Sequence, residues 1–214
     1  DGLAGYPLID VYLTGKELKL AAEVDASVSD FMTTARLYCS GLNFTFNPHR
    51  MILNKVTDCY LTREDGERIE IQDDQLYRVV TDLYTGQMLG SVMEMSYGLL
   101  KIEPKDKDGN PIENLEDQAI MEGDKELKAW DAIARYMKSF DDTDGNGISN
   151  VPEYYETTHG RKVVDESRNV IDLVKNPNKF SVMIIGIVLV LILIIILLVV
   201  LIRKLIKKRR RKKK

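Results

Sequence analysis

The stretch DTDGNGISNVPE, Asp142 to Glu153, places side-chain oxygens at the spacing of a calcium-binding loop. Hard cations such as Ca²⁺ take carboxylate and amide oxygens from alternate positions around a sharp glycine turn, and Gly147 stands at that turn. The candidate ligands are Asp142, Asp144, Asn146, Asn150 and Glu153. So few carboxylates would bind Ca²⁺ weakly, as extracellular modules do. The alternative interpretation is a solvated Asx/Gly turn that ends the preceding helix.

Other metal-dependent or hydrolytic chemistry has little support in the sequence. The chain has only two histidines, His49 and His159, and it lacks the His and carboxylate motifs of metallohydrolases. It also lacks a GxSxG nucleophile motif and a phosphate-binding P-loop. We therefore expect no catalytic residue within these 214 residues.

Charge divides the chain into an acidic body and a basic tail. The formal net charge is −3, but residues 203–214, RKLIKKRRRKKK, hold ten Lys and Arg residues and no acid. Without those ten, 20 basic residues remain against 33 acidic ones, which is a net charge of −13. An acidic body argues against nucleic acid as a partner, because binding to phosphates requires Lys and Arg on the contacting face.

An uncharged apolar run of 22 residues, 181–202, precedes the basic tail. As a helix it would rise roughly 33 Å, enough for a bilayer core of about 30 Å, so we predict a transmembrane helix and the lipid bilayer as a partner. Positive flanks stay in the cytoplasm, so we expect a single-pass plasma-membrane protein with residues 1–180 extracellular. No LPxTG-like motif precedes the run, and a GPI signal would end in its apolar tail; we therefore expect the helix to be retained.

The elements expected before the membrane helix mix strands and helices. T-G-K-E, from Thr14 to Glu17, is a capping box after a β-rich segment and predicts a helix from about Gly15 to Val24. A later apolar stripe that includes Trp130 predicts a helix after Asp124 that packs on a sheet. Strands are expected at 8–13, 42–46, 56–61 and 76–83. The predicted fold class is α+β, with a mixed sheet and packed helices.

The two cysteines, Cys39 and Cys59, allow two interpretations. An exported domain permits a disulfide, and a hairpin between the two segments would bring the cysteines opposite each other. Both can equally be small buried apolar residues with free thiols.

Three motifs, in this order and spacing, resemble the C-terminal domain of the 5′-nucleotidase family. They are the L-T-G-K-E-L corner (Leu13 to Leu18), S-G-L with an alternating strand (Ser40 to Phe46), and the Y-R-V strand (Tyr77 to Val79). The resemblance covers roughly residues 5–103. It implies the substrate-binding part of a bifunctional metallophosphatase/5′-nucleotidase or UDP-sugar hydrolase. The divalent metals (Mn, Zn or Mg) and the catalytic His motifs would belong to an N-terminal metallophosphatase domain that is absent from this chain.

The resemblance also implies a pocket in which two aromatic rings hold the base of a nucleotide-like small molecule. Tyr6 is the nearest ring before the first strand, and Tyr84 is the nearest ring after the Y-R-V strand. These two are the candidate substrate-binding residues. The family's G-D-G-[FY] motif is missing, since Tyr84 to Gly90 reads YTGQMLG.

We therefore expect four parts: a substrate-binding domain (1–156), a tether (157–180), the transmembrane helix (181–202) and a cytoplasmic tail (203–214). The leading hypothesis is the substrate-binding part of a membrane-anchored extracellular phosphohydrolase that acts on 5′-nucleotides or nucleotide sugars in nucleotide catabolism. The alternative is a non-catalytic cell-surface binding or spacer module with a Ca²⁺-binding loop.

Overall fold

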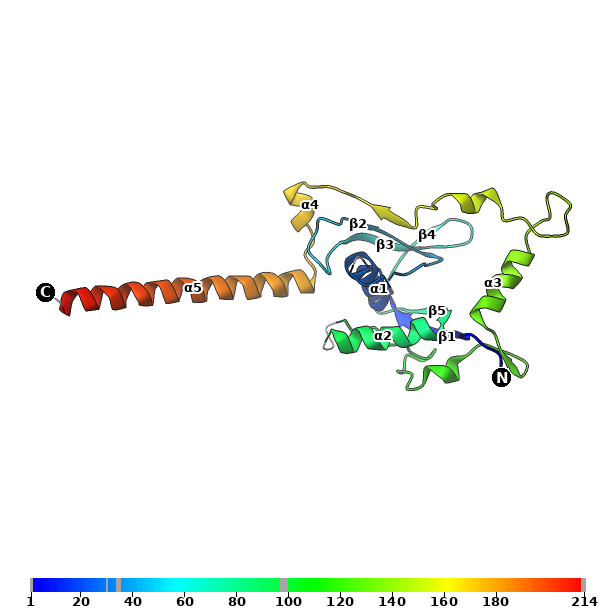
Figure 1. The fold of residues 1–214 in the computed structure, drawn as a ribbon, viewed down its shortest axis with the longest axis horizontal. Coiled ribbons are helices and arrows are strands. Elements are labelled where there is room, and N and C mark those ends of the chain that lie inside the picture. Colours follow the sequence, from blue (N-terminus) through cyan, green and yellow to red (C-terminus); the bar gives the residue numbers. More distant parts are fainter. Residues whose placement is uncertain (1, 30, 34–35, 97–99, 213–214) are drawn as a thin grey trace.

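The computed structural model describes residues 2–29, 31–33, 36–96 and 100–212, which form an α+β fold with a long C-terminal helix (Figure 1). The strands are β1 (Leu8–Thr14), β2 (Leu42–Phe46), β3 (Val56–Thr62), β4 (Arg68–Glu70), β5 (Leu76–Asp82), β6 (Met121–Glu122), β7 (Lys125–Glu126) and β8 (Lys162–Val164). The helices are α1 (Gly15–Val28), α2 (Leu83–Met95), α3 (Ala129–Lys138), α4 (Val170–Val174) and α5 (Lys179–Lys212), with 3-10 turns η2 (Leu115–Gln118) and η3 (Glu153–Glu156). The expected α+β class is confirmed.

Helix α1 lies between two sheets (Figure 1). Strands β1 and β5 form an antiparallel pair, in which Leu8 stands opposite Asp82 and Thr14 opposite Leu76. The second sheet has the order β4-β3-β2-β8 and is mixed, because β2 is antiparallel to β3 but parallel to β8. The predicted strands at 42–46, 56–61 and 76–83 are therefore confirmed.

The core lies on both faces of α1. Leu18, Ala21 and Val24 pack in one cluster with Leu13 of β1 and Ile102, while Ala22 and Ala26 face Phe44 of β2. Two-sided burial explains why α1 continues past Val24, where we expected it to end. Its buried carboxylates accept backbone hydrogen bonds from distant loops. Glu23 Oε1 accepts from Lys55 N at 2.6 Å, and Asp25 Oδ1 accepts from Leu37 N at 2.6 Å.

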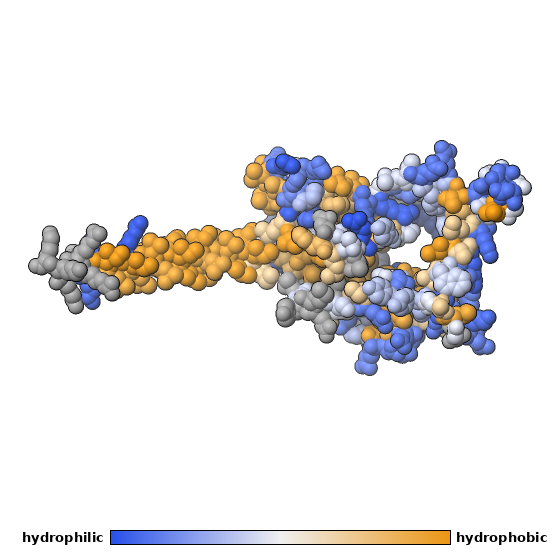
Figure 2. Space-filling view, in the orientation of Figure 1, coloured by the Kyte–Doolittle hydropathy of each residue, from blue (hydrophilic) through white to orange (hydrophobic). Residues whose placement is uncertain are grey.

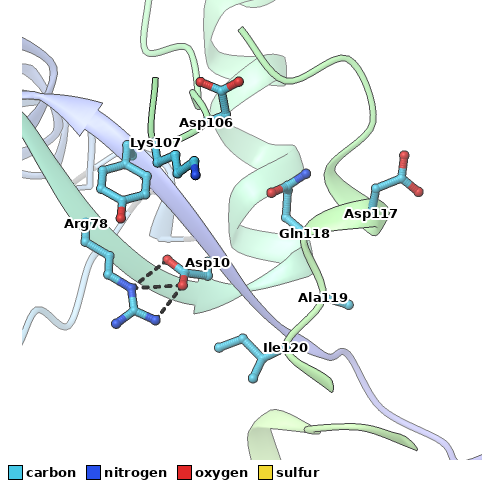
Figure 3. Close-up of a pocket in the computed structure, with 9 residues that line it drawn as sticks. Asp10, Arg78, Asp106, Lys107, Asp117, Gln118, Ala119 and Ile120 are labelled. Carbon is cyan, nitrogen blue, oxygen red and sulfur yellow. Dashed lines mark hydrogen bonds and ion pairs between the residues drawn. The ribbon is translucent and has the colours of Figure 1, made fainter. Parts of the chain in front are cut away.

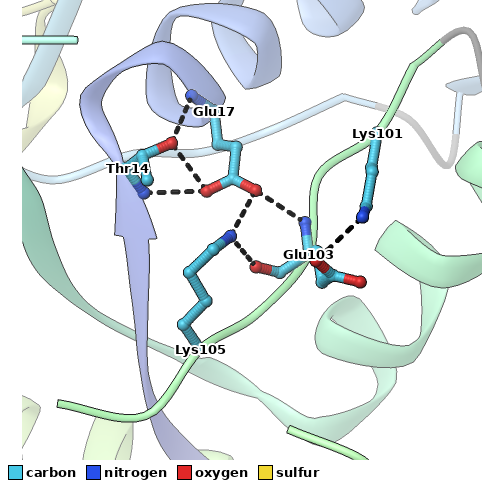
Figure 4. Close-up of polar contacts among 5 residues, drawn as sticks. All are labelled: Thr14, Glu17, Lys101, Glu103 and Lys105. Atoms are coloured by element: carbon cyan, nitrogen blue, oxygen red, sulfur yellow. Dashed lines mark hydrogen bonds and ion pairs between the residues drawn. The ribbon is translucent and has the colours of Figure 1, made fainter. Parts of the chain in front are cut away.

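The corner between β1 and α1 has the capping box that the sequence predicts. Glu17 N donates to Thr14 Oγ1 at 3.3 Å, and Thr14 N donates to Glu17 Oε2 at 2.8 Å. Glu17 also pairs with Lys105 at 2.6 Å, which ties the corner to the segment after α2 (Figure 4). At Gly15 a Cβ atom would stand 2.1 Å from the Gln72 carbonyl oxygen, so only glycine fits there.

The helix predicted after Asp124 forms, as α3, but the prediction that it packs on the sheet is wrong. None of its residues is buried, and Trp130 is 54% exposed. Trp130 Nε1 donates to the Ala4 carbonyl at 3.0 Å, so the ring lies against the N-terminal segment. The helix stands at the edge of the fold, away from both sheets (Figure 1). An apolar stripe shows which face of a helix favours burial, but it does not identify the part of the protein that packs against that face.

The segment expected to be a tether, 157–180, contains regular structure that joins the domain. β8 adds a parallel strand beside β2, and Asp165 N donates to the Phe46 carbonyl at 2.9 Å. Helix α4 follows, and Phe180, in the first turn of α5, is only 4% exposed in the core cluster of Leu13 and Leu18. The polar composition of this segment hid these contacts, because its partners, strand β2 and the core cluster of Leu13 and Leu18, lie far away in the sequence.

Helix α5 projects from the domain as a single apolar rod (Figure 2). Residues Lys179–Lys208 are long and apolar enough to cross a membrane, and the most apolar part of that stretch is not buried against the described protein. Its basic C-terminal end begins at Arg203. Length and composition therefore agree with the predicted span 181–202.

Candidate substrate-binding site

A groove of about 740 Å³ is lined by both sheets, α1 and α2. Most of its lining is apolar, from residues such as Leu18, Leu42 and Ile102. Two arginines, Arg36 and Arg78, and several hydroxyl groups supply the polar part. A mainly apolar cleft of this size with few polar groups is typical of sites for small molecules.

Tyr84 lines this groove, and the fold places Tyr6 against it. Tyr84 is the second residue of α2, which begins directly after β5. Asp82 Oδ1 accepts a hydrogen bond from Thr85 N at 2.9 Å in the first turn of this helix. Leu83 N donates to the Pro7 carbonyl at 2.9 Å, which joins the start of α2 to the start of β1. The two rings therefore meet, with centroids 5.5 Å apart and planes inclined by 38°. The structure brings the two predicted residues together.

The rings of Tyr6 and Tyr84 lie too close together to hold a base between them. Two rings that hold a planar base between them stand about 7 Å apart, because each contact takes about 3.5 Å. At 5.5 Å, Tyr6 and Tyr84 contact each other instead. Their side chains are 53% and 42% exposed, so both are accessible to a ligand. A planar ligand would stack on the outer face of Tyr84 or separate the two rings.

A further aromatic residue at the groove, Tyr38, was missed in the sequence. It is 88% exposed and lines the groove together with Tyr84. Lys162 Nζ of β8 lies 5.5 Å from the Tyr38 ring centroid, a cation–π distance. The available signal was its position, since Tyr38 precedes the S-G-L motif by a single residue, Cys39.

Comparison with known proteins assigns the fold around this groove. The profile of the family "5′-nucleotidase, C-terminal domain" matches residues 4–96, which include Tyr6, Tyr38 and Tyr84. Residues 4–96 belong to this family. No protein of curated function matches the chain.

Two solved structures are similar to this chain. One is a 5′-nucleotidase precursor from Thermus thermophilus, with 19% identity and a TM-score of 0.48, covering 76% of this chain and 26% of that chain. The other is the NAD nucleotidase of Haemophilus influenzae, with 21% identity and a TM-score of 0.34, covering 48% of this chain and 19% of that chain. The chain therefore spans about a quarter or less of the length of either structure.

A second, polar hollow of about 470 Å³ lies beside the 5′-nucleotidase C-terminal domain's β1–β5 pair (Figure 3). Arg78 forms an ion pair with Asp10 at its edge, in which Nε donates to Oδ2 at 2.8 Å and to Oδ1 at 2.9 Å, and Nη2 also donates to Oδ2. Asp106, Lys107 and Asp117 add charges of both signs. With mixed charges, this hollow favours neither anions nor cations.

The loop predicted to bind Ca²⁺ lies outside the residues that match the family and is closed by its own hydrogen bonds. Asp142 Oδ2 accepts from Gly147 N at 2.8 Å, and Asp142 Oδ1 accepts from Gly145 N at 2.8 Å. These bonds hold the pKa of Asp142 below its ordinary value. Asn146 Nδ2 donates to Asp144 Oδ2 at 2.9 Å, and Asn150 Oδ1 accepts from Thr143 N at 2.8 Å.

Three of the predicted ligands, Asp142, Asp144 and Asn146, thus lie together, whereas Glu153 opens the 3-10 turn η3. In the part of the chain that the structure describes, no three His, Cys, Asp or Glu side chains converge as a metal-binding group. Calcium binding remains a prediction.

A second copy of the pattern D-x-D-G-N-x-I-x-N begins at Asp106. There Asp106 Oδ1 accepts from Asp108 N and from Asn110 N, both at 2.9 Å. Hydrogen bonds from Asn110 lower the pKa of Asp106 in the same way as backbone bonds lower that of Asp142. The first aspartate of the pattern therefore accepts hydrogen bonds from nearby N–H groups in both loops.

The cysteines are free thiols in the structure. Burial raises the pKa of Cys39, and it raises the pKa of Cys59 to about 12. Both thiols are therefore protonated at neutral pH and weak nucleophiles. Cys59 stands opposite Phe44 in the β2–β3 hairpin and packs against the cluster of Ala22, Ala26 and Phe44, so it acts as a small apolar residue there.

Proposed function

We propose that this chain is the substrate-binding part of a membrane-anchored, nucleotidase-like phosphohydrolase that acts on 5′-nucleotides or nucleotide sugars outside the cell. The observation that carries the proposal is the 5′-nucleotidase C-terminal domain at residues 4–96, whose groove exposes Tyr38 and Tyr84. Aromatic faces of this kind stack on nucleic acid bases.

The chain would contribute binding and orientation. Tyr84, with Tyr6 or Tyr38, would hold the base, and Arg36 would attract the phosphate from the groove lining. A metallophosphatase domain outside this chain would hold the divalent metals (Mn, Zn or Mg) that supply an activated water. A base fixed in the groove would place its phosphate at a defined position relative to that domain.

The membrane part of the proposal rests on α5. Its apolar stretch is long enough to span a bilayer, and the basic residues that follow favour a cytoplasmic C-terminus. The domain would then stand on the extracellular side.

The alternative is a non-catalytic surface module with a Ca²⁺ loop. The closed Tyr6–Tyr84 pair favours it, because rings in mutual contact leave no gap for a base. Under this alternative, Ca²⁺ would stiffen the Asp142 loop beside the aromatic cluster of Tyr136, Phe140 and Tyr155.

The test is an assay of the gene product purified with its upstream region, in detergent. We expect phosphate release from AMP or UDP-glucose that requires Mn²⁺ and is abolished by EDTA. Tyr84→Ala should raise KM. The control is Tyr154→Ala, which changes a tyrosine that lies outside the groove and is 59% exposed, and it should leave KM unchanged. If a well-folded protein releases no phosphate, the proposed enzymatic function is refuted and the non-catalytic surface module is the function that stands.

A further inference from the structure

The root of α5 is locked to the domain. Phe180 and Ser181 are 4% and 2% exposed, although they begin the helix predicted to enter the membrane. Asn178 caps this helix, because its Oδ1 accepts from Phe180 N at 3.1 Å and from Ser181 N at 3.0 Å. The same side chain donates through Nδ2 to the Leu53 carbonyl of the β2–β3 loop. The axis of α5 is therefore fixed relative to the domain.

A buried arginine fixes α4 to the same loop. Arg50, 8% exposed, donates to three carbonyl groups: Asn54 at 2.7 Å, Asp172 at 2.9 Å and Lys175 at 2.6 Å. The last two belong to the C-terminal end of α4, whose carbonyls have no partner within the helix. Helix α4, the β2–β3 loop and the root of α5 thus form one hydrogen-bonded unit.

The outer face of α4 is apolar and exposed. Val170, Ile171 and Val174 are 71%, 69% and 65% exposed, whereas Leu173 is half-buried. Asn169 caps the helix, with its Oδ1 accepting from Ile171 N at 3.0 Å, so the helix does not depend on burial of these three side chains. Such exposure of neighbouring aliphatic side chains marks a contact surface.

This apolar face lies at the level where α5 leaves the domain. Figure 1 shows α4 beside the first turns of α5, at the end of the domain nearest to the span. Figure 2 shows hydrophobic surface gathered at that end, next to the apolar rod. Only Lys175, Asn176, Pro177 and Asn178 separate the two helices, and Asn176 turns the chain with a φ of 51°.

We propose that α4 is a membrane-contact element, in which Val170, Ile171 and Val174 insert into the outer interface of the bilayer beside the anchor. This inference rests on the membrane anchoring in the proposed function. The bilayer is the occupant because the apolar face of α4 continues the apolar surface of the span at the same level, and α5 cannot tilt away from it. Lys175 and Lys179, both exposed, flank the face at headgroup level and match anionic phosphates.

The consequence is a fixed orientation of the domain on the membrane. A second contact beside a single anchor removes rotation about a loose tether. The groove with Tyr38 and Tyr84 would then keep one direction relative to the bilayer surface.

The experiment reconstitutes the full chain in vesicles of phosphatidylcholine with an anionic phospholipid, unlabelled or brominated at shallow acyl positions. Bromine quenches a nearby indole. The variant Trp130→Phe with Ile171→Trp has its only tryptophan on α4, and the unsubstituted chain, whose only tryptophan is Trp130 on α3, is the control. We expect brominated lipid to quench the emission of the α4 variant strongly and to leave that of the control unchanged.

Two results would overturn the inference, and each refutes a different part of it. If the protein floats with the vesicles but bromine quenches the α4 variant no more than the control, α4 does not enter the interface and the anchor stands. If the protein fails to float, the anchoring itself is wrong. Neither result depends on phosphate release, so failure of the enzymatic proposal is recognised separately. Circular dichroism of both proteins checks that the substitutions preserve the fold.

Discussion

The ion pair of Glu17 with Lys105 gives the sharpest prediction for stability. Glu17 Oε1 accepts from Lys105 Nζ at 2.6 Å and from Glu103 N at 3.1 Å, and the two paired side chains are only 11% and 14% exposed (Figure 4). Glu17→Gln removes the charge but keeps the hydrogen-bonding shape that a capping box accepts. The substitution therefore isolates the charge of Glu17 from its role in the helix cap.

The expected loss in the free energy of unfolding is about 2 kcal/mol. Breaking a fully buried pair costs about 3–5 kcal/mol, because one charge is left without its partner. The loss is smaller here because Lys105 keeps some exposure and its contact with the Glu103 carbonyl at 2.7 Å. For a chain of this size the loss lowers Tm by about 4–8 °C. Thermal unfolding of the full chain in detergent, followed by circular dichroism, measures it.

Acid should erase the difference between the two proteins. Burial acts to raise the pKa of Glu17, but hydrogen bonds from Lys105, Thr14 and Glu103 outweigh it and hold the pKa below its ordinary value. The ionised form therefore stabilises the fold fully above the unfolded-state pKa of about 4.3, and this contribution is lost as pH falls through the lower folded-state pKa. An equal difference in Tm at neutral and at strongly acidic pH would refute the electrostatic explanation.

The exposed pair of Asp58 with Arg68 is the matched control. Its side chains are 41% and 45% exposed, and the N–O distance is 2.8 Å. Solvent screens such a pair, so Asp58→Asn should cost at most about 1 kcal/mol. A larger loss for this control than for Glu17→Gln would mean that burial does not set the strength of these pairs.

Three further predictions concern other sites. Gly15→Ala should destabilise the chain by roughly 1–3 kcal/mol in the same unfolding assay, although alanine normally favours a helix, because its Cβ would meet the Gln72 carbonyl; an unchanged Tm would contradict this. Tyr84→Ala should weaken binding of AMP by about 5- to 150-fold in calorimetry, as loss of one stacked base contact does, while Tyr154→Ala should leave it unchanged. Asp142→Asn should abolish Ca²⁺ binding measured by calorimetry; loss of binding on Asp106→Asn alone would place the cation in the second copy of the pattern and contradict the prediction for the Asp142 loop.

Signals that act over a few residues predicted most of the elements around the site. The capping box of Thr14 and Glu17 formed as expected, and the alternation of Leu42, Phe44 and Phe46 marked a strand. The resemblance to the family selected Tyr6 and Tyr84, which the fold brings into contact. These features depend on neighbouring residues or on short motifs, so they are visible in a single sequence.

Features that depend on distant partners could not be predicted. Glu23 and Asp25 suggest a solvated end of α1, yet both are buried because backbone N–H groups of residues 37, 55 and 56 donate to them. The stripe of α3 predicted burial against the sheet, but the helix instead lies beside the N-terminal segment through Trp130. Nothing local in the sequence identifies which surface meets a given face.

Arg50 shows why a polar linker can still be rigid. A buried guanidinium without acceptors would be unstable, and its three hydrogen bonds to carbonyl groups are possible only when residues 172 and 175 lie against the β2–β3 loop. The requirement to satisfy this charge therefore selects one position of α4. Asn178 acts similarly at the next turn, where its amide joins the Leu53 carbonyl to the first N–H groups of α5. Polar side chains thus connect α5 to the domain, and under the proposed membrane contact this connection would hold α4 at a defined depth.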